Sequence, residues 1–185
     1  MRWVPFLILV YVVLLVQTTV GRILTFPRTA WGTVGPDIAA IVAVYLALHL
    51  RDGLDLALAT WTLGLAVDLT TGGAMVGPMA LAYLAAGATV LTLREAVFRE
   101  RPAAQMLMAL VFCLLAHGLW VTVESLGLPP ASRSWGQYRW MLRQACVLAL
   151  YTAVLMPPGH WALARMERFL IAPQSGRSRG AWGRR

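Results

Sequence analysis

Long apolar stretches are the feature that most limits the folds open to this chain. Six of them follow one another along the sequence: Val4–Val20, Ile38–Leu50, Leu54–Leu69, Met75–Leu93, Met106–Leu126 and Met141–Met156. A helix needs about 20 apolar residues to cross a bilayer core of about 30 Å. Charged residues make up only 13% of the 185 residues, about half of their usual share in soluble domains. We therefore predict an all-α integral membrane protein with about six transmembrane helices.

The second run is short, which raises the question of whether it forms a re-entrant hairpin with the third. Its 13 residues would rise only about 20 Å as a helix. A hairpin within the bilayer would hold Arg51 and Asp52 near its centre, where each charge costs about 2.5–3.5 kcal/mol. A turn on the water side avoids that cost, so we predict two separate spans. Arg2 before the first run would suit a signal peptide, but no small-x-small cleavage site follows, and we predict a retained anchor.

The arginines predict the orientation of the chain. All sixteen basic residues are arginine, a composition typical of a GC-rich bacterial coding sequence. If the N-terminus is cytoplasmic, eleven arginines lie on the cytoplasmic side and five on the other. Basic residues gather in cytoplasmic loops, so we predict a multi-pass protein of the bacterial cytoplasmic (inner) membrane with both termini inside. This bias also explains the formal charge of +8, and we expect no binding to nucleic acid.

The domain organisation follows from the same pattern. Residues 1–172 are predicted to form a single six-helix membrane domain, and residues 173–185 a basic, disordered cytoplasmic tail. The second to fourth spans are rich in alanine and glycine, which let helix backbones approach closely in lipid. We expect these spans to form the close-packed centre, and the bulky first span to be peripheral.

Few polar residues remain that could carry chemistry. Asp37, Asp52 and Asp55 stand at the starts of spans, where a carboxylate caps free N–H groups. Asp68 lies at the C-terminal end of the third span, where the helix dipole disfavours an anion. We predict that the following residues 70–73 curl back and donate to it, with a polar contact to a partner as the alternative. His117 is expected to bond to a neighbouring helix.

Known catalytic patterns are missing. The aspartates at 52 and 68 loosely resemble the motif of CDP-alcohol phospholipid synthases, but His49 replaces the first aspartate and Gly64 is out of register. The sequence has no nucleophile elbow, no zinc-protease motif and no phosphate loop. Asp55 and Asp68 lie about 20 Å apart along one helix, too far to share a metal. We predict no catalytic residue, no cofactor and no metal site, and hence no enzyme.

Several short motifs lie in a defined order between residues 35 and 95. Pro36-Asp37 leads the second run, Gly64 precedes Asp68 in a Gly-x-x-x-Asp-Leu motif, and Ala-Leu-Ala-Tyr ends at Tyr83. This order resembles the rod shape-determining protein MreD family. The resemblance covers about a third of the chain and implies structural or partner-contact roles for Pro36, Asp37, Gly64, Asp68, Gly72, Gly73 and Tyr83. Between Gly73 and Ala80 the chain departs from the family's more usual Pro-Leu-Gly-like turn.

The resemblance carries functional expectations. It implies a non-enzymatic membrane scaffold subunit of the bacterial cell-wall elongation (rod) complex, which supports cell shape. Its partners would be an MreC-like bitopic membrane protein, the MreB filament, the peptidoglycan transpeptidase and glycosyltransferase pair, and the lipid bilayer. MreD is also similar in fold to the substrate-binding subunits of energy-coupling-factor transporters. The alternative is therefore a substrate-binding membrane subunit of a small-molecule (vitamin-type) transporter, which needs an outer pocket of polar residues.

Overall fold

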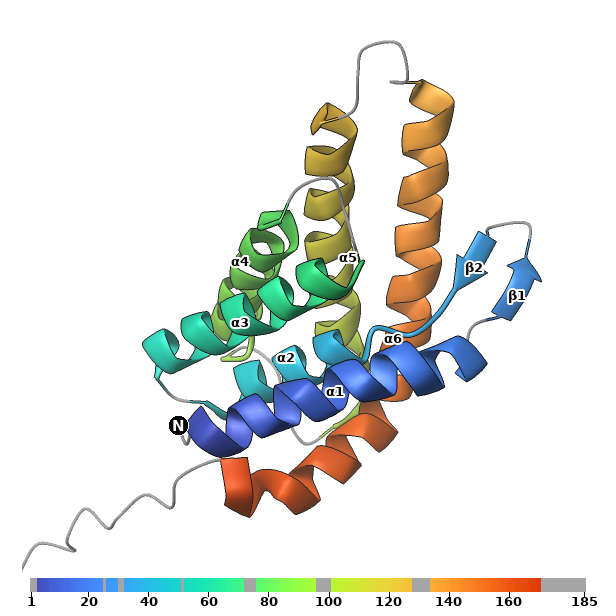
Figure 1. Cartoon of the computed structure of the whole chain (residues 1–185). Coiled ribbons are helices and arrows are strands. Elements are labelled where there is room, and N and C mark those ends of the chain that lie inside the picture. The colour runs from blue at the N-terminus through green and yellow to red at the C-terminus, as the bar shows by residue number, and fades with distance from the viewer. Residues whose placement is uncertain are drawn as a thin grey trace, which may run out of the picture.

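The computed structural model describes residues 3–24, 26–29, 32–50, 52–71, 76–95, 101–127 and 134–170. Gly72, Gly73 and the predicted tail at 173–185 lie outside these residues. The elements in chain order are α1 (Trp3–Leu24), β1 (Phe26–Thr29), β2 (Gly32–Val34), α2 (Ile38–His49), α3 (Gly53–Thr71), α4 (Pro78–Leu93), α5 (Pro102–Gly127) and α6 (Trp135–Leu170) (Figure 1).

The helical class is confirmed, with one addition. Among the described residues, three helices are long and apolar enough to cross a membrane: Gly53–Thr71, Pro102–Gly127 and Trp135–Met166. The helices over Trp3–Thr19, Ile38–His49 and Pro78–Leu93 are apolar but shorter. The addition is a small antiparallel hairpin between α1 and α2, in which Phe26 of β1 lies opposite Val34 of β2. The sequence did not predict this hairpin, because it lies between two apolar runs and has no apolar run of its own.

α2 lies at the centre of the molecule. Each residue from Ala39 to Leu48 is buried, and α2 contacts every other helix. α1 packs one side inward through Phe6, Leu9 and Val13 and leaves the opposite side exposed. The predicted positions of the central second span and the peripheral first span are therefore confirmed. α3 and α4 are less central than predicted, since each leaves an apolar side exposed, at Leu58 and Leu81 for example.

The helices do not share one direction. α5 and the first part of α6 run side by side as a long antiparallel hairpin, and α1 crosses the lower part of that hairpin at a steep angle (Figure 1). α3 and α4 form a second antiparallel pair that packs against α5 through α4. These two pairs and α1 enclose α2.

Two glycines permit the close approach of α3 and α4. A Cβ atom added at Gly64 would lie 2.6 Å from both the Ala80 Cα and the Met79 carbonyl oxygen. A Cβ atom at Gly87 would lie 2.7 Å from the Thr60 Cγ2 atom. At Gly64 the neighbouring atoms are backbone and cannot rotate away. The predicted close packing through small residues is confirmed at this interface.

Gly64→Ala is expected to lower stability, because the new methyl group collides with the α4 backbone and forces the helices apart. Overpacking of this kind costs about 1–3 kcal/mol. Gly118→Ala is the matched control: it also lies inside a helix, and nothing lies within 4 Å of its added Cβ. Thermal unfolding in detergent should show a clear loss for Gly64→Ala, and no loss or a slight gain for Gly118→Ala. Equal midpoints for the two variants would contradict the close contact.

Candidate functional site

Asp37 is a buried carboxylate at the N-terminus of α2. Its backbone is extended, with φ −91° and ψ 97°, and its Oδ1 atom accepts from the Ala40 N–H at 3.0 Å. The residue is only 3% exposed. A carboxylate at this position satisfies a free N–H group and faces the positive end of the helix dipole. The predicted capping role is therefore confirmed, and Pro36, which precedes Asp37, is buried as well.

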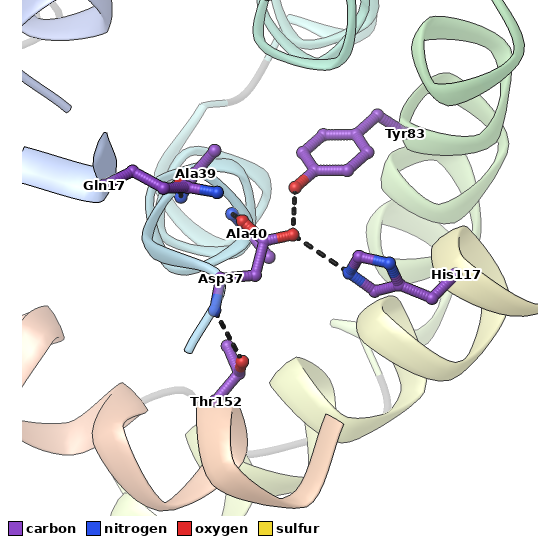
Figure 2. A network of polar contacts seen from close by, with 7 residues as sticks. All are labelled: Gln17, Asp37, Ala39, Ala40, Tyr83, His117 and Thr152. Atoms are coloured by element: carbon purple, nitrogen blue, oxygen red, sulfur yellow. Dashed lines mark hydrogen bonds and ion pairs between the residues drawn. The ribbon is translucent and has the colours of Figure 1, made fainter. Parts of the chain in front are cut away.

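The second carboxylate oxygen of Asp37 joins α2 to two other helices. The Tyr83 hydroxyl of α4 donates to Oδ2 at 2.5 Å, and Nε2 of His117 in α5 lies 3.0 Å from the same atom (Figure 2). An ionised carboxylate only accepts hydrogen bonds, so Nε2 of His117 carries a proton in this arrangement. Taken together, α2, α4 and α5 supply three donors. They offset the cost of burying a polar group away from water.

Two further helices bind the backbone at the same place. The Asp37 N–H donates to Thr152 Oγ1 of α6 at 3.0 Å, and the Ala39 N–H donates to Gln17 Oε1 of α1 at 3.2 Å. Figure 2 shows these side chains converging on the start of α2. We call Gln17, Asp37, Tyr83, His117 and Thr152 the α2 network. It ties together α1, α2, α4, α5 and α6.

The predicted bond from His117 to a neighbouring helix is confirmed. No carboxylate lies one turn away on α5, and the partner comes from 80 positions earlier in the chain. The sequence offered no signal for this pairing, because Asp37 alone already has a complete local explanation as a helix cap.

Asp68 caps α4 from outside that helix. Its Oδ2 atom accepts from the N–H groups of Gly77 at 2.9 Å, Met79 at 3.1 Å and Ala80 at 3.2 Å. Gly77 is the N-cap residue, has φ +123° and offers no capping side chain, while Pro78 has no N–H. Asp68 thus does what a cap side chain of α4 itself would do, and its charge faces the positive end of that helix.

The prediction that hydrogen-bond donors hold the Asp68 carboxylate is confirmed. The predicted donors are wrong at Thr70 and Thr71, the two that the structure describes. The Thr70 and Thr71 hydroxyls donate to carbonyl oxygens of their own helix, chiefly that of Val67. Both residues are still inside α3, so their hydroxyls meet carbonyls one turn back. Gly72 and Gly73, which complete the predicted turn, lie outside the described residues.

Several motif residues belong to one continuous contact. Gly64 lies one turn before Asp68 on α3, and a Cβ atom at Gly64 would lie 2.9 Å from Tyr83 Cβ. Gly64 and Asp68 therefore both face the first turns of α4, and Tyr83 of α4 extends the contact to Asp37. The motifs thus meet in space although they lie on three helices.

Arg94 holds the other end of α2. Its Nη1 atom donates to the carbonyl oxygens of Ala47, at 2.9 Å, and Leu50. The Ala47 carbonyl lies in the last turn of α2 and Leu50 is the C-cap residue, so the cation stands at the end of the helix where it is favourable. Arg94 is one of the eleven arginines predicted to be cytoplasmic, and no further role was predicted for it, because a basic residue after an apolar run fits that rule equally well. Asp52 meets the prediction of a cap, since its Oδ1 atom accepts from the Leu54 N–H at 3.0 Å.

A cavity lies beside the α2 network. It has a volume of about 280 Å³ and lies between α5 and α6 next to Val34. His117, Trp120 and Trp140 line it, together with Gln137 and Gln144. His117 therefore stands between Asp37 and this cavity. The polar groups of the cavity come from the helices α5 and α6.

No group of three or more histidine, cysteine, aspartate or glutamate side chains that could hold a metal occurs within the described ranges. No protein-family model, curated protein or solved structure matches the chain.

Asp68→Ala is expected to destabilise the α3–α4 pair, because the Met79 and Ala80 N–H groups lose their acceptor. A buried unsatisfied donor costs about 1–3 kcal/mol. Asp68→Asn should be milder, since an amide oxygen still accepts. Thr70→Ala is the control, because that hydroxyl binds only its own helix. The measurements are thermal stability and abundance. If Thr70→Ala lowers both as much as Asp68→Ala does, Thr70 supports the carboxylate after all, as the sequence predicted.

Tyr83→Phe is expected to lower stability by about 1.5–3 kcal/mol, the range for hydrogen bonds to charged groups. The ring stays in place, and only the donor to Asp37 is lost. Tyr11→Phe serves as the control, since Tyr11 is exposed on α1. The double variant with Asp37→Asn should lose less stability than the sum of the losses of the two single variants, because both substitutions remove the same hydrogen bond. Strict additivity in unfolding measurements would show that the two residues are not coupled.

Proposed function

We propose that this chain is a non-enzymatic membrane scaffold subunit of the bacterial rod complex, which supports cell shape during cell-wall elongation. The observation that carries the proposal is the use of the motif residues: Asp37, Gly64, Asp68 and Tyr83 all join helices to one another. Both carboxylates are bound to donors of the chain itself. This suits residues that maintain a shape better than residues that act on a substrate.

The same proposal includes six spans in the inner membrane with both termini cytoplasmic, in a fold like that of the energy-coupling-factor substrate-binding subunits. Because α1 crosses the α5–α6 hairpin at a steep angle, both must then tilt away from the membrane normal. α5 has 26 residues, more than the roughly 20 that a perpendicular span needs, so it has length to spare for tilt. The ends of α2 need not lie at either membrane surface, because Asp37 accepts from an N–H group at its start and Arg94 donates to a carbonyl at its end inside the protein. Reporter fusions at positions 51, 99 and 177 should then read cytoplasmic, and those at 29 and 132 periplasmic.

A groove between α4 and α5 supports a helical partner. It has a volume of about 460 Å³, and Gly77, Leu81, Ala82, Ala85, Leu119 and Val123 are among its lining residues. Small residues in such a groove let a second helix approach closely in lipid. We propose that the membrane helix of an MreC-like bitopic protein packs here. The MreB filament and the transpeptidase and glycosyltransferase pair would join through that complex.

Photo-cross-linking in living cells tests this proposal. A photoreactive residue at Leu81, in the groove, should capture the bitopic partner. One at Leu150 of α6 should not, although the two leucines are similarly exposed at 63% and 58%. Leu81→Trp should fill the groove and lower co-purification of the partner, while Leu150→Trp leaves it unchanged. Equal capture at both positions, or none at Leu81, would contradict the scaffold proposal at this surface.

The cavity beside His117 favours a second candidate, a substrate-binding subunit of a small-molecule transporter. Two indole rings and two amide side chains provide both stacking and hydrogen bonding for a small planar molecule. Mass spectrometry of the protein purified in mild detergent separates the two proposals. A stoichiometric small molecule that Trp140→Ala removes, with no bitopic partner, would replace the scaffold proposal with the transporter one.

A further inference from the structure

α6 is too long to be only a membrane span. It covers 36 residues, which rise about 54 Å, whereas the hydrocarbon core is about 30 Å thick. Residues 135–156 alone rise about 33 Å. The helix contains Pro157 and Pro158, which cannot donate to the carbonyls one turn before them and so bend the helix. Figure 1 shows the bend: the last part of α6 leaves α5 and runs across below α1 and α2.

We define residues 157–170 as the C-terminal arm. Its inner side is docked on the protein: a Cβ atom at Gly159 would lie 2.7 Å from Ile41 Cγ2, and Leu163 belongs to the buried core. The His160 ring lies 5.2 Å from that of Tyr45. The arm is thus held against α2 and has a fixed outer side.

The outer side combines an aromatic ring with a cation. Trp161 is 60% exposed, and the Arg165 guanidinium lies 3.8 Å over its ring. Met166 is exposed beside them. An indole ring and an arginine whose stem lies along apolar surface are the side chains that favour the boundary between lipid and water.

The charge of this end points to an anionic occupant. From residue 157 onward the sequence has six arginines and one acid, Glu167. Arginine binds phosphate through several planar donors, and a basic amphipathic helix is attracted to anionic lipid. The helix over Trp135–Met166 is long and apolar enough to span a membrane. A span of about 30 Å that starts at Trp135 would end near residue 155, so the arm would begin at the level of the head groups.

We propose that the C-terminal arm lies in the membrane–water interface, where Arg165, stacked on Trp161, binds the phosphate of anionic phospholipid head groups. The bend at Pro157-Pro158 turns the arm away from the axis of the α5–α6 hairpin, so the arm would set the depth of the helix core in the bilayer. This inference depends on membrane insertion and not on the scaffold function.

Spin labels on the full chain in lipid nanodiscs test the position of the arm. Cys146, the exposed native cysteine, is replaced by serine, while Cys113 is buried. Labels are placed at Ala162 in the arm, at Val154 before the prolines and at Ser134 before α6. The label at Val154 should be accessible to oxygen dissolved in the lipid, and the label at Ser134 should be accessible to a water-soluble nickel complex. The label at Ala162 should have intermediate accessibility to both agents. Its accessibility to nickel should fall when phosphatidylglycerol replaces phosphatidylcholine.

Native mass spectrometry of retained lipid tests the binding chemistry. Arg165→Gln should lower the preference for phosphatidylglycerol over phosphatidylcholine about fivefold. Arg165→Lys should keep only part of the preference, because the charge remains but the planar donors and the stacking on Trp161 are lost. The proposal is overturned if Ala162 is as nickel-accessible as Ser134 in both lipids, or if Arg165→Gln keeps the full preference. A label that becomes immobile only when other membrane proteins are added would assign the surface to a protein instead.

Discussion

A helix buried inside a protein cannot leave its terminal N–H and C=O groups to water, and α2 is enclosed by the other helices along its whole length. Its first N–H groups bind Asp37 and Gln17, and its last carbonyls bind Arg94. Asp37 in turn is buried and needs its own donors, which Tyr83 and His117 supply. The positions of α4 and α5 therefore follow from the need to satisfy one short helix.

The contact between α3 and α4 combines two kinds of complementarity. Gly64 removes the side chain that would keep the backbones apart, and Asp68, one turn later on the same side, meets the N–H groups that the approach exposes. Neither residue serves its purpose alone, because the carboxylate reaches the start of α4 only at close range. A glycine and an aspartate four positions apart thus form a useful pair where one helix packs closely against the start of another.

Much of the architecture could be predicted from local properties of the sequence. Apolar length and small residues predicted the helices and the central position of α2, and the dipole argument predicted that Asp68 needs a clamp. The partners of Asp68 could not be predicted, because Gly77 and Met79 contribute only backbone groups, which have no sequence signature. The roles of Tyr83, Gln17 and Thr152 depend on tertiary packing in the same way. Gln17 and Thr152 look like ordinary residues of apolar runs until their neighbours are known, and the resemblance that marked Tyr83 did not identify its partner.

The sequence separations within the α2 network have a consequence for biosynthesis. Three hydrogen-bond partners of Asp37 follow it in the sequence: Tyr83 is 46 positions later, His117 is 80 positions later and Thr152 is 115 positions later. When α2 has just been synthesised, none of these residues has been made, and the Asp37 carboxylate has no donors outside its own helix. α2 therefore cannot settle in its final environment until α6 has been synthesised. The contacts at the centre of the fold are therefore completed by α6, the last of the described helices to be made.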